Sequence, residues 1–156
     1  MDEASAPGTG FLAEVCKAWE QEIFSGGAHE RARETRKVAI RTGIVLGREG
    51  GALAKLLPIF KAGVGGPVGS GRQWMSWIHA EDLVQAYVQA LNDPRLRGPV
   101  NVVAPAPVTN SEFSKTLGRV LRRPAFLPAP AIALKLALGE MSTLVLDSQR
   151  VRPGQL

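Results

Sequence analysis

The sequence is poor in the residues that build disulfides and metal centres. Its 156 residues include one cysteine and two histidines, so an internal disulfide or a cysteine-rich zinc site is excluded and no metal site is expected. No apolar run approaches the ~20 residues that a membrane-spanning helix needs. The first four residues are acidic or small, unlike a secretory signal. We therefore expect a soluble, intracellular protein with no membrane partner.

Aromatic residues are also scarce, and this bears on the positive charge. The chain has 19 Lys and Arg against 14 Asp and Glu, a formal net charge of +5. Much of the excess lies in residues 25–37, where Glu30 and Glu34 interrupt the basic residues and no aromatic follows until Phe60. Nucleic-acid binding favours a basic stripe with aromatics or a reading motif. We interpret 25–37 as a solvated charged loop and expect no nucleic-acid partner.

Apolar spacing predicts helices that alternate with strands. Positions 12, 15, 16, 19 and 23 share one face of a helix, on which we expect Cys16 to be buried and inert. Segments 38–47 and 100–104 are rich in β-branched residues and predict strands buried on both faces, as in a parallel sheet. Two strands are too few for a sheet of typical size, ~4–6 strands. The pattern therefore indicates the second half of something larger.

Helix signals occupy the rest of the chain. Helices are predicted at 51–63 after two glycines, at 79–92 before Asn92-Asp93-Pro94, and beyond the capping box Thr109-Asn-Ser-Glu112. The tail predicts two short helices, at 132–138 and 141–146. Helices alternating with buried strands indicate an α/β architecture.

Two features invite a chemical interpretation. Residues 63–71 are rich in glycine, but they follow a helix rather than a strand, so a structural loop is favoured over a phosphate-binding one. His79 stands beside Glu81 and Asp82, where it is a candidate general base and equally a helix cap. Trp74 and Trp77 are three residues apart, so on a strand they would point to opposite faces and one could line a pocket.

Three segments together resemble extended short-chain dehydrogenases/reductases. They are Arg-Thr-Gly-Ile-Val-Leu-Gly at 41–47, Gly-Ser-Gly-Arg-Gln-Trp-Met-Ser-Trp-Ile-His-Ala-Glu-Asp at 69–82, and residues 98–112. Segments 11–20, 50–55, 138–141 and 148–153 further resemble the atypical subgroup of epimerase family, or cell-division-inhibitor-like, proteins. That subgroup includes plant plastid-division relatives, and the resemblance also implies a DUF1731 domain.

The resemblance implies an α/β fold: the C-terminal part of a Rossmann-like doubly wound parallel sheet plus a small helical substrate-binding portion. Residues 1–156 would form a single partial domain. Its Rossmann units would be 10–47 and 79–104, its substrate-cleft part 48–78 and 105–156, and 25–37 a charged insertion. Family members carry an N-terminal half with a glycine fingerprint that this sequence lacks, so a fragment is expected.

The resemblance also implies a site for NADP or NAD and an unidentified small-molecule substrate. Thr42, Gly43, Ile44 and Val45 would bind the cofactor, and Gln73, Trp74, Trp77 and His79 would line the substrate cleft. The family's Tyr-x-x-x-Lys pair has no match, because the only tyrosine, Tyr87, is followed four residues later by Leu91. Met75 stands where many nucleotide-sugar enzymes carry an arginine for the substrate's phosphates.

Two functions stay open. The first is an atypical NAD(P)-binding epimerase or oxidoreductase whose C-terminal half is inactive alone. The second is a non-catalytic regulatory or scaffold protein related to cell or plastid division. A cytoplasmic or plastid-stromal location and a homo-oligomeric state are compatible with either function.

Overall fold

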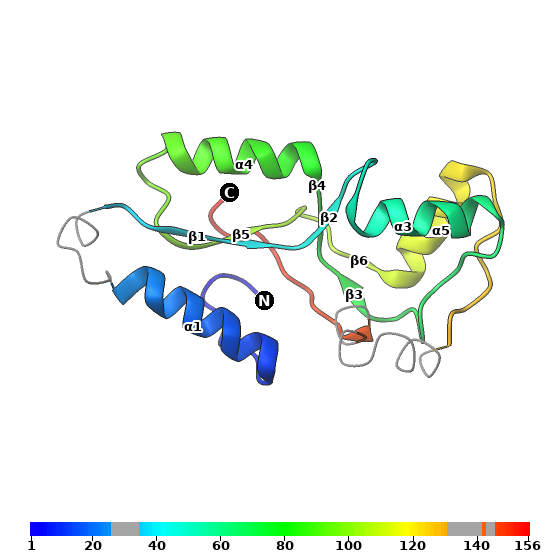
Figure 1. The fold of residues 1–156 in the computed structure, drawn as a ribbon, viewed down its shortest axis with the longest axis horizontal. Helices are drawn as coiled ribbons and strands as arrows, with labels where there is room; N and C mark the ends of the chain where they lie inside the picture. The colour runs from blue at the N-terminus through cyan, green and yellow to red at the C-terminus, as the bar shows by residue number, and fades with distance from the viewer. Residues whose placement is uncertain (26–34, 131–141, 143–145) are drawn as a thin grey trace.

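The computed structural model describes residues 1–25, 35–130, 142 and 146–156. Most of the charged loop, the predicted helix at 132–138 and most of that at 141–146 lie outside these residues. The described chain alternates helices and strands (Figure 1), in the order α1 (Phe11–Ser25), β1 (Val38–Thr42), β2 (Ile44–Leu46), α3 (Gly51–Lys61), β3 (Trp74–Met75), β4 (Trp77–His79), α4 (Ala80–Asn92), β5 (Gly98–Val102), β6 (Val108–Thr109) and α5 (Asn110–Leu121). The four helices up to residue 121 and the two predicted strand segments occur in the predicted order, but the structure has more strands than were predicted.

The strand predicted over 38–47 is two strands, because its pairing partner changes at Gly43. β1 pairs in parallel with β5, whereas β2 pairs in parallel with β4. At the junction the Gly43 N–H donates to the Val102 carbonyl at 3.3 Å, and the Ile44 N–H donates to the Ser76 carbonyl at 2.8 Å. A Cβ on Gly43 would lie 2.5 Å from the Ser76 carbonyl oxygen, so this close approach requires glycine.

A third pair was not predicted. β3 and β6 run antiparallel, with Trp74 opposite Thr109 and Met75 opposite Val108. Each strand has only two residues, so neither carries a period that could be read from the sequence. The pair joins the segment before β4 to the start of α5.

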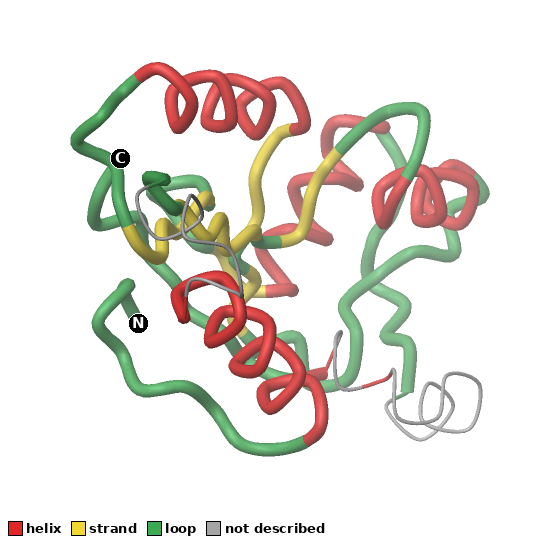
Figure 2. Tube along the Cα trace, turned by 60° about the vertical axis from the view of Figure 1, so that its left-hand side comes forward, coloured by secondary structure: helices red, strands yellow, loops and turns green. Residues whose placement is uncertain are grey.

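The core lies between α4 and the parallel strands. Ile78, Ala86, Val100 and Val102 are buried there, and partly buried apolar residues pack against them: Val38, Ile40, Val45 and Leu83. Figures 1 and 2 show α4 on one side of β1 and β5 and α1 on the other, which is the layering of a doubly wound sheet.

Side chains fix both ends of α4. The His79 Nδ1 accepts a hydrogen bond from the Glu81 N–H at 3.3 Å, which satisfies a donor at the helix start. The Arg36 guanidinium donates to the carbonyls of Leu91 and Leu96, each at 3.0 Å, at the other end. His79 therefore acts as the helix cap that the sequence allowed.

The capping box predicted at α5 is confirmed. The Glu112 N–H donates to the Thr109 hydroxyl at 3.3 Å, and the Glu112 carboxylate accepts from the Thr109 N–H at 2.7 Å. This reciprocal pair satisfies two backbone donors that the first helical turn leaves open.

The prediction that Cys16 is buried was wrong. The thiol is exposed, and no residue of α1 is buried. On the apolar face of α1, Leu12 is 50% exposed and Trp19 is 68% exposed. An amphipathic pattern identifies the apolar face of a helix, but it does not show whether another element covers that face. In the described part of the chain, most of the apolar face of α1 is not covered.

Candidate functional site

A cavity of about 840 Å³ opens where β1 ends. Its wall combines α1, the β1–β2 junction, β3, the first residues of the chain and the segment after residue 146. Ligands of open α/β sheets bind outside the carboxyl ends of the strands, which is the position of this cavity. Its volume suits a small organic molecule or part of a larger cofactor.

The cavity brings together some of the predicted site residues and not others. Thr42, Gly43 and Ile44 line it, and so does Trp74. Val45 packs against the core instead. The functional roles of these residues stay predictions.

The other predicted substrate-side residues lie off the lining. The Gln73 side chain is buried and donates to the Val68 carbonyl at 3.0 Å. His79 is exposed, and its Nδ1 accepts a hydrogen bond from the Glu81 N–H at the start of α4. The Trp77 indole N–H is buried without a hydrogen-bond partner in the described chain. Because β3 and β4 are separate strands, Trp74 and Trp77 do not belong to one strand with two faces.

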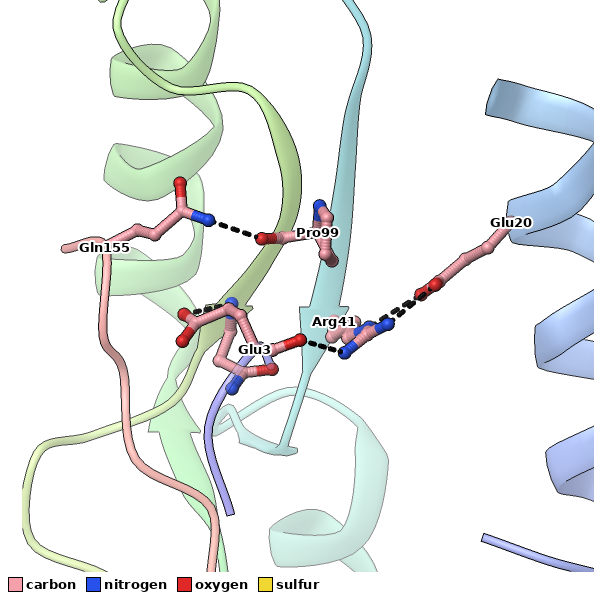
Figure 3. Close-up of polar contacts among 6 residues, drawn as sticks. Glu3, Glu20, Arg41, Pro99 and Gln155 are labelled. Atoms are coloured by element: carbon pink, nitrogen blue, oxygen red, sulfur yellow. Dashed lines mark hydrogen bonds and ion pairs between the residues drawn. The ribbon is translucent and has the colours of Figure 1, made fainter. Parts of the chain in front are cut away.

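An ion pair that the sequence reasoning missed connects α1 to β1. The Arg41 Nε lies 2.6 Å from Glu20 Oε1, and Nη2 lies 2.7 Å from Oε2, a bidentate pair (Figure 3). The hydrogen bonds from Arg41 lower the pKa of Glu20 despite its partial burial. The pair fixes the position of α1 as one wall of the cavity.

The first residues of the chain are attached to β5 through Glu3. Its carboxylate accepts from the Asn101 N–H at 3.0 Å and from the Gly154 N–H at 3.1 Å. Burial raises the pKa of Glu3, and these backbone bonds outweigh it and lower the pKa overall. The Gln155 amide donates to the Pro99 carbonyl at 2.8 Å. Both chain ends therefore belong to the structure around the cavity.

The segment 147–151 forms the wall beside β3. The Ser76 hydroxyl donates to the Gln149 carbonyl and accepts from the Val151 N–H, both at 2.8 Å. The Arg150 guanidinium stacks over the Trp74 ring, 4.3 Å from its centroid. These contacts hold an irregular segment in place, and irregular segments carry no periodic sequence signal.

A buried amide lies next to Met75 in the same lining. Asn110 is 7% exposed and begins α5, where its N–H donates to the Gln73 carbonyl at 2.9 Å. Its Oδ1 accepts from the Val68 N–H at 2.7 Å, and its Nδ2 lies 3.2 Å from the Met75 sulfur. Sequence reasoning passed over Asn110 because it stands inside the capping box, where a structural role accounts for a polar residue.

The described residues offer no cluster of metal ligands, and Tyr87 lies away from the cavity. Among its residues, no three His, Cys, Asp or Glu side chains are grouped so that they could hold a metal ion. Tyr87 lies on α4, half exposed, and is not part of the cavity lining. Within the same residues, no helix is long and apolar enough to cross a membrane.

The residues present fit the nicotinamide end of a dinucleotide. The cavity offers backbone groups at Thr42 and Gly43 and the apolar side chains of Ile44 and Met75, which suit a flat ring. The Gly-x-Gly-x-x-Gly motif that binds a dinucleotide's pyrophosphate does not occur in the sequence. The fit that the lining supports is therefore to the ring and ribose.

Comparison with known protein families gives two matches. The NAD dependent epimerase/dehydratase family matches residues 28–103, and a domain of unknown function, DUF1731, matches residues 129–156. The epimerase family protein SDR39U1 homolog, chloroplastic, of Arabidopsis thaliana is 48% identical over 153 residues, 98% of this chain and 43% of the relative. Epimerase family protein Mb2239 of Mycobacterium bovis is 44% identical over 159 residues, 100% of this chain and 51% of the relative. The chain thus spans about half the length of these relatives.

A solved structure of a relative also matches nearly the whole of this chain. The crystal structure of human epimerase family protein SDR39U1 (isoform 2) with NADPH superposes with a TM-score of 0.89 at 37% identity. The match covers 98% of this chain and 51% of that one. The predicted Rossmann-like α/β fold is thereby confirmed.

Proposed function

Because the chain belongs to the NAD-dependent epimerase/dehydratase family, we propose that it forms the substrate-side half of a cleft that binds NADP(H). The observation that carries this proposal is the cavity at the end of β1, lined by Thr42, Gly43 and Ile44. Its place at the carboxyl end of a parallel strand is where such sheets bind ligands. The NADPH named with the human relative favours NADP(H) over NAD(H).

The chain's own residues have defined tasks in this proposal. Backbone groups of Thr42 and Gly43 contact the nicotinamide ribose, and Trp74 lies toward the substrate. The Arg41–Glu20 pair holds α1 against the cleft, and the Ser76 hydroxyl holds the segment 147–151 over it. A nicotinamide bound there would supply hydride transfer.

The remaining predicted residues support the cleft from outside its lining. Val45 fixes β2 through the core, and Gln73 fixes the turn that precedes β3 through the Val68 carbonyl. His79 starts α4, and Trp77 belongs to the strand that pairs with β2. We propose positioning roles for these four residues.

Calorimetric titration of NADPH tests the proposal. The full-length protein that contains this chain should bind NADPH, and residues 1–156 alone should bind weakly or not at all, because the sequence has no Gly-x-Gly-x-x-Gly motif for the phosphates. Thr42 is exposed and lines the cleft, so the larger side chain of Thr42→Trp should occupy part of the cleft. This variant should weaken NADPH binding at least about tenfold. Thr116→Trp, the same change at an exposed threonine of α5 off the lining, should leave binding unchanged. Nanomolar binding by residues 1–156, or equal affinity in both variants, would refute the proposal.

A second candidate is a non-catalytic regulatory or scaffold protein related to division. It is supported by the placement of Tyr87 on α4, away from the cavity, with Leu91 where a partner lysine would stand. Turnover decides between the two functions. Oxidation of NADPH by the full-length protein with a carbonyl substrate, lost in Thr42→Trp and kept in Thr116→Trp, would exclude the scaffold role.

A further inference from the structure

The Asn110 side chain has a fixed orientation. Its amide is almost fully buried, with the residue 7% exposed, and its oxygen accepts from the Val68 N–H at 2.7 Å. A backbone N–H can only donate, so the oxygen must face Val68 and the NH2 group must face Met75. Both Asn110 and Met75 belong to the lining of the 840 Å³ cavity.

The NH2 group has hydrogen-bonding capacity left. It carries two protons, and among the described residues its one acceptor is the Met75 sulfur at 3.2 Å. A thioether is a weak acceptor, so this buried donor is poorly satisfied. The Ser76 hydroxyl in the same lining, by contrast, both donates and accepts at 2.8 Å. A ligand oxygen would give the Asn110 NH2 group the strong acceptor that the described residues do not provide.

The charges around the cavity do not favour a phosphate as the partner of this amide. Acidic side chains in the lining are Asp2, Glu20 and Asp147, against the basic Lys17 and Arg41. The Arg41 guanidinium is engaged by Glu20 at 2.6 Å, so it does not balance a second anion. The side chain that Asn110 contacts within the lining, Met75, is apolar. The surroundings suit a neutral molecule with an apolar body.

We propose that Asn110 is a specificity-determining residue, which donates its amide N–H to the carbonyl or hydroxyl oxygen of an uncharged substrate held against Met75. The backbone connects this position to the cofactor end of the cleft. Ile44 bonds the Ser76 carbonyl at 2.8 Å, and Met75 precedes Ser76. The inference rests on the proposed function only in taking NADP(H) to bind at the cofactor end of the cleft. The substrate class is a neutral ketone, aldehyde or alcohol, and not a nucleoside diphosphate.

Methionine methyl signals provide the test, because the chain has three methionines and Met75 is readily assigned by substitution. Cyclohexanone, a neutral ring with one acceptor oxygen, is titrated into 13C-methyl-Met, 15N-labelled protein. The Met75 methyl and the Asn110 side-chain NH2 should shift with one common Kd. Cyclohexylammonium and inorganic phosphate, at the same concentrations, should shift them less.

Two variants separate recognition from folding. Asn110→Asp keeps an oxygen for the Val68 N–H and removes both donors, so the Kd for cyclohexanone should rise about tenfold. Ser114→Ala is the matched control: Ser114 is also buried on α5, bonds the Gly66 carbonyl at 3.2 Å and lies off the lining. Its Kd should stay that of the wild type.

The outcomes distinguish this inference from the proposed function. An unmoved Met75 methyl, an equal Kd in Asn110→Asp, or a stronger response to phosphate would each overturn the role of Asn110. NADPH affinity of the full-length protein is measured separately, on the wild type. Absence of NADPH binding there would overturn the proposed function while leaving the cyclohexanone result intact.

Discussion

Gly43→Ala is expected to destabilise the protein strongly, although glycine inside a strand is ordinarily less favourable than alanine by about 0.5–1 kcal/mol. The added methyl carbon would lie 2.5 Å from the Ser76 carbonyl oxygen, 2.9 Å from its carbonyl carbon and 2.9 Å from the Val103 Cγ1. The first two atoms are backbone, so no rotamer change relieves the clash. Relief requires β1–β2 and the Ser76 backbone to separate by several tenths of an ångström.

That separation has a calculable cost. Overpacking alone costs about 1–3 kcal/mol. Moving Ser76 away also weakens the 2.8 Å bond from the Ile44 N–H, worth about 1 kcal/mol net. The lower backbone entropy of alanine in the unfolded chain returns about 0.4–1 kcal/mol. The free energy of unfolding should therefore fall by about 1–3.5 kcal/mol.

Urea denaturation followed by tryptophan fluorescence measures this change as a shift of midpoint at constant slope. Gly47→Ala is the control, because a methyl there would meet the Ala80 Cβ at 3.7 Å, an ordinary contact. It should leave stability within about 0.5 kcal/mol of the wild type or raise it. A Gly43→Ala variant as stable as Gly47→Ala would refute the argument that close backbone approach requires glycine at the junction.

Two further predictions concern α5 and α1. Thr109→Ala removes the hydroxyl acceptor of the capping box and should cost about 1 kcal/mol in urea denaturation, whereas Thr116→Ala, at an exposed position of the same helix, should cost far less. Glu20→Gln should lower stability by about 1 kcal/mol at pH 7, a value kept small because Arg41 is 37% exposed. Since the folded pKa of Glu20 is lowered, its contribution is complete above the ordinary value of 4.5 and lost as the pH falls through the folded pKa. The difference between wild type and Glu20→Gln should therefore shrink on acidification, and a difference that persists at pH 2 would contradict this assignment.

Sequence reasoning recovered the elements whose signals are local. Thr109 and Glu112 stand three residues apart, and Asn92-Asp93-Pro94 ends α4 as expected. The break at Gly43 had a visible sign, a glycine inside a β-branched run, but its cause lies in Ser76, more than thirty residues away. A single strand was therefore predicted where the structure has two.

The cleft was harder to predict from the sequence than the helices and strands, because segments that are far apart in the chain build it. Glu3 bonds Gly154 across 151 positions of the chain, and Ser76 bonds Gln149 across 73. Such contacts have no periodicity, and the segment after residue 146 forms no long element that would reveal its path. The exposed Cys16 has a related cause, since an apolar stripe does not state whether another element covers it.

The bonds of Arg36 to the Leu91 carbonyl at the C-terminal end of α4 and to the Leu96 carbonyl beyond it change how the net charge of +5 should be interpreted. Its guanidinium donates to the Leu91 carbonyl, where the helix presents partial negative charge. Asp93, whose pKa is lowered to about 2 mainly by Arg95, also feels the Arg36 charge. This cation is thus compensated within the fold, and it offers little attraction to a polyanion in solution. Ion-exchange behaviour should reflect the other basic residues, so replacing Arg36 would alter stability more than retention on a cation-exchange column.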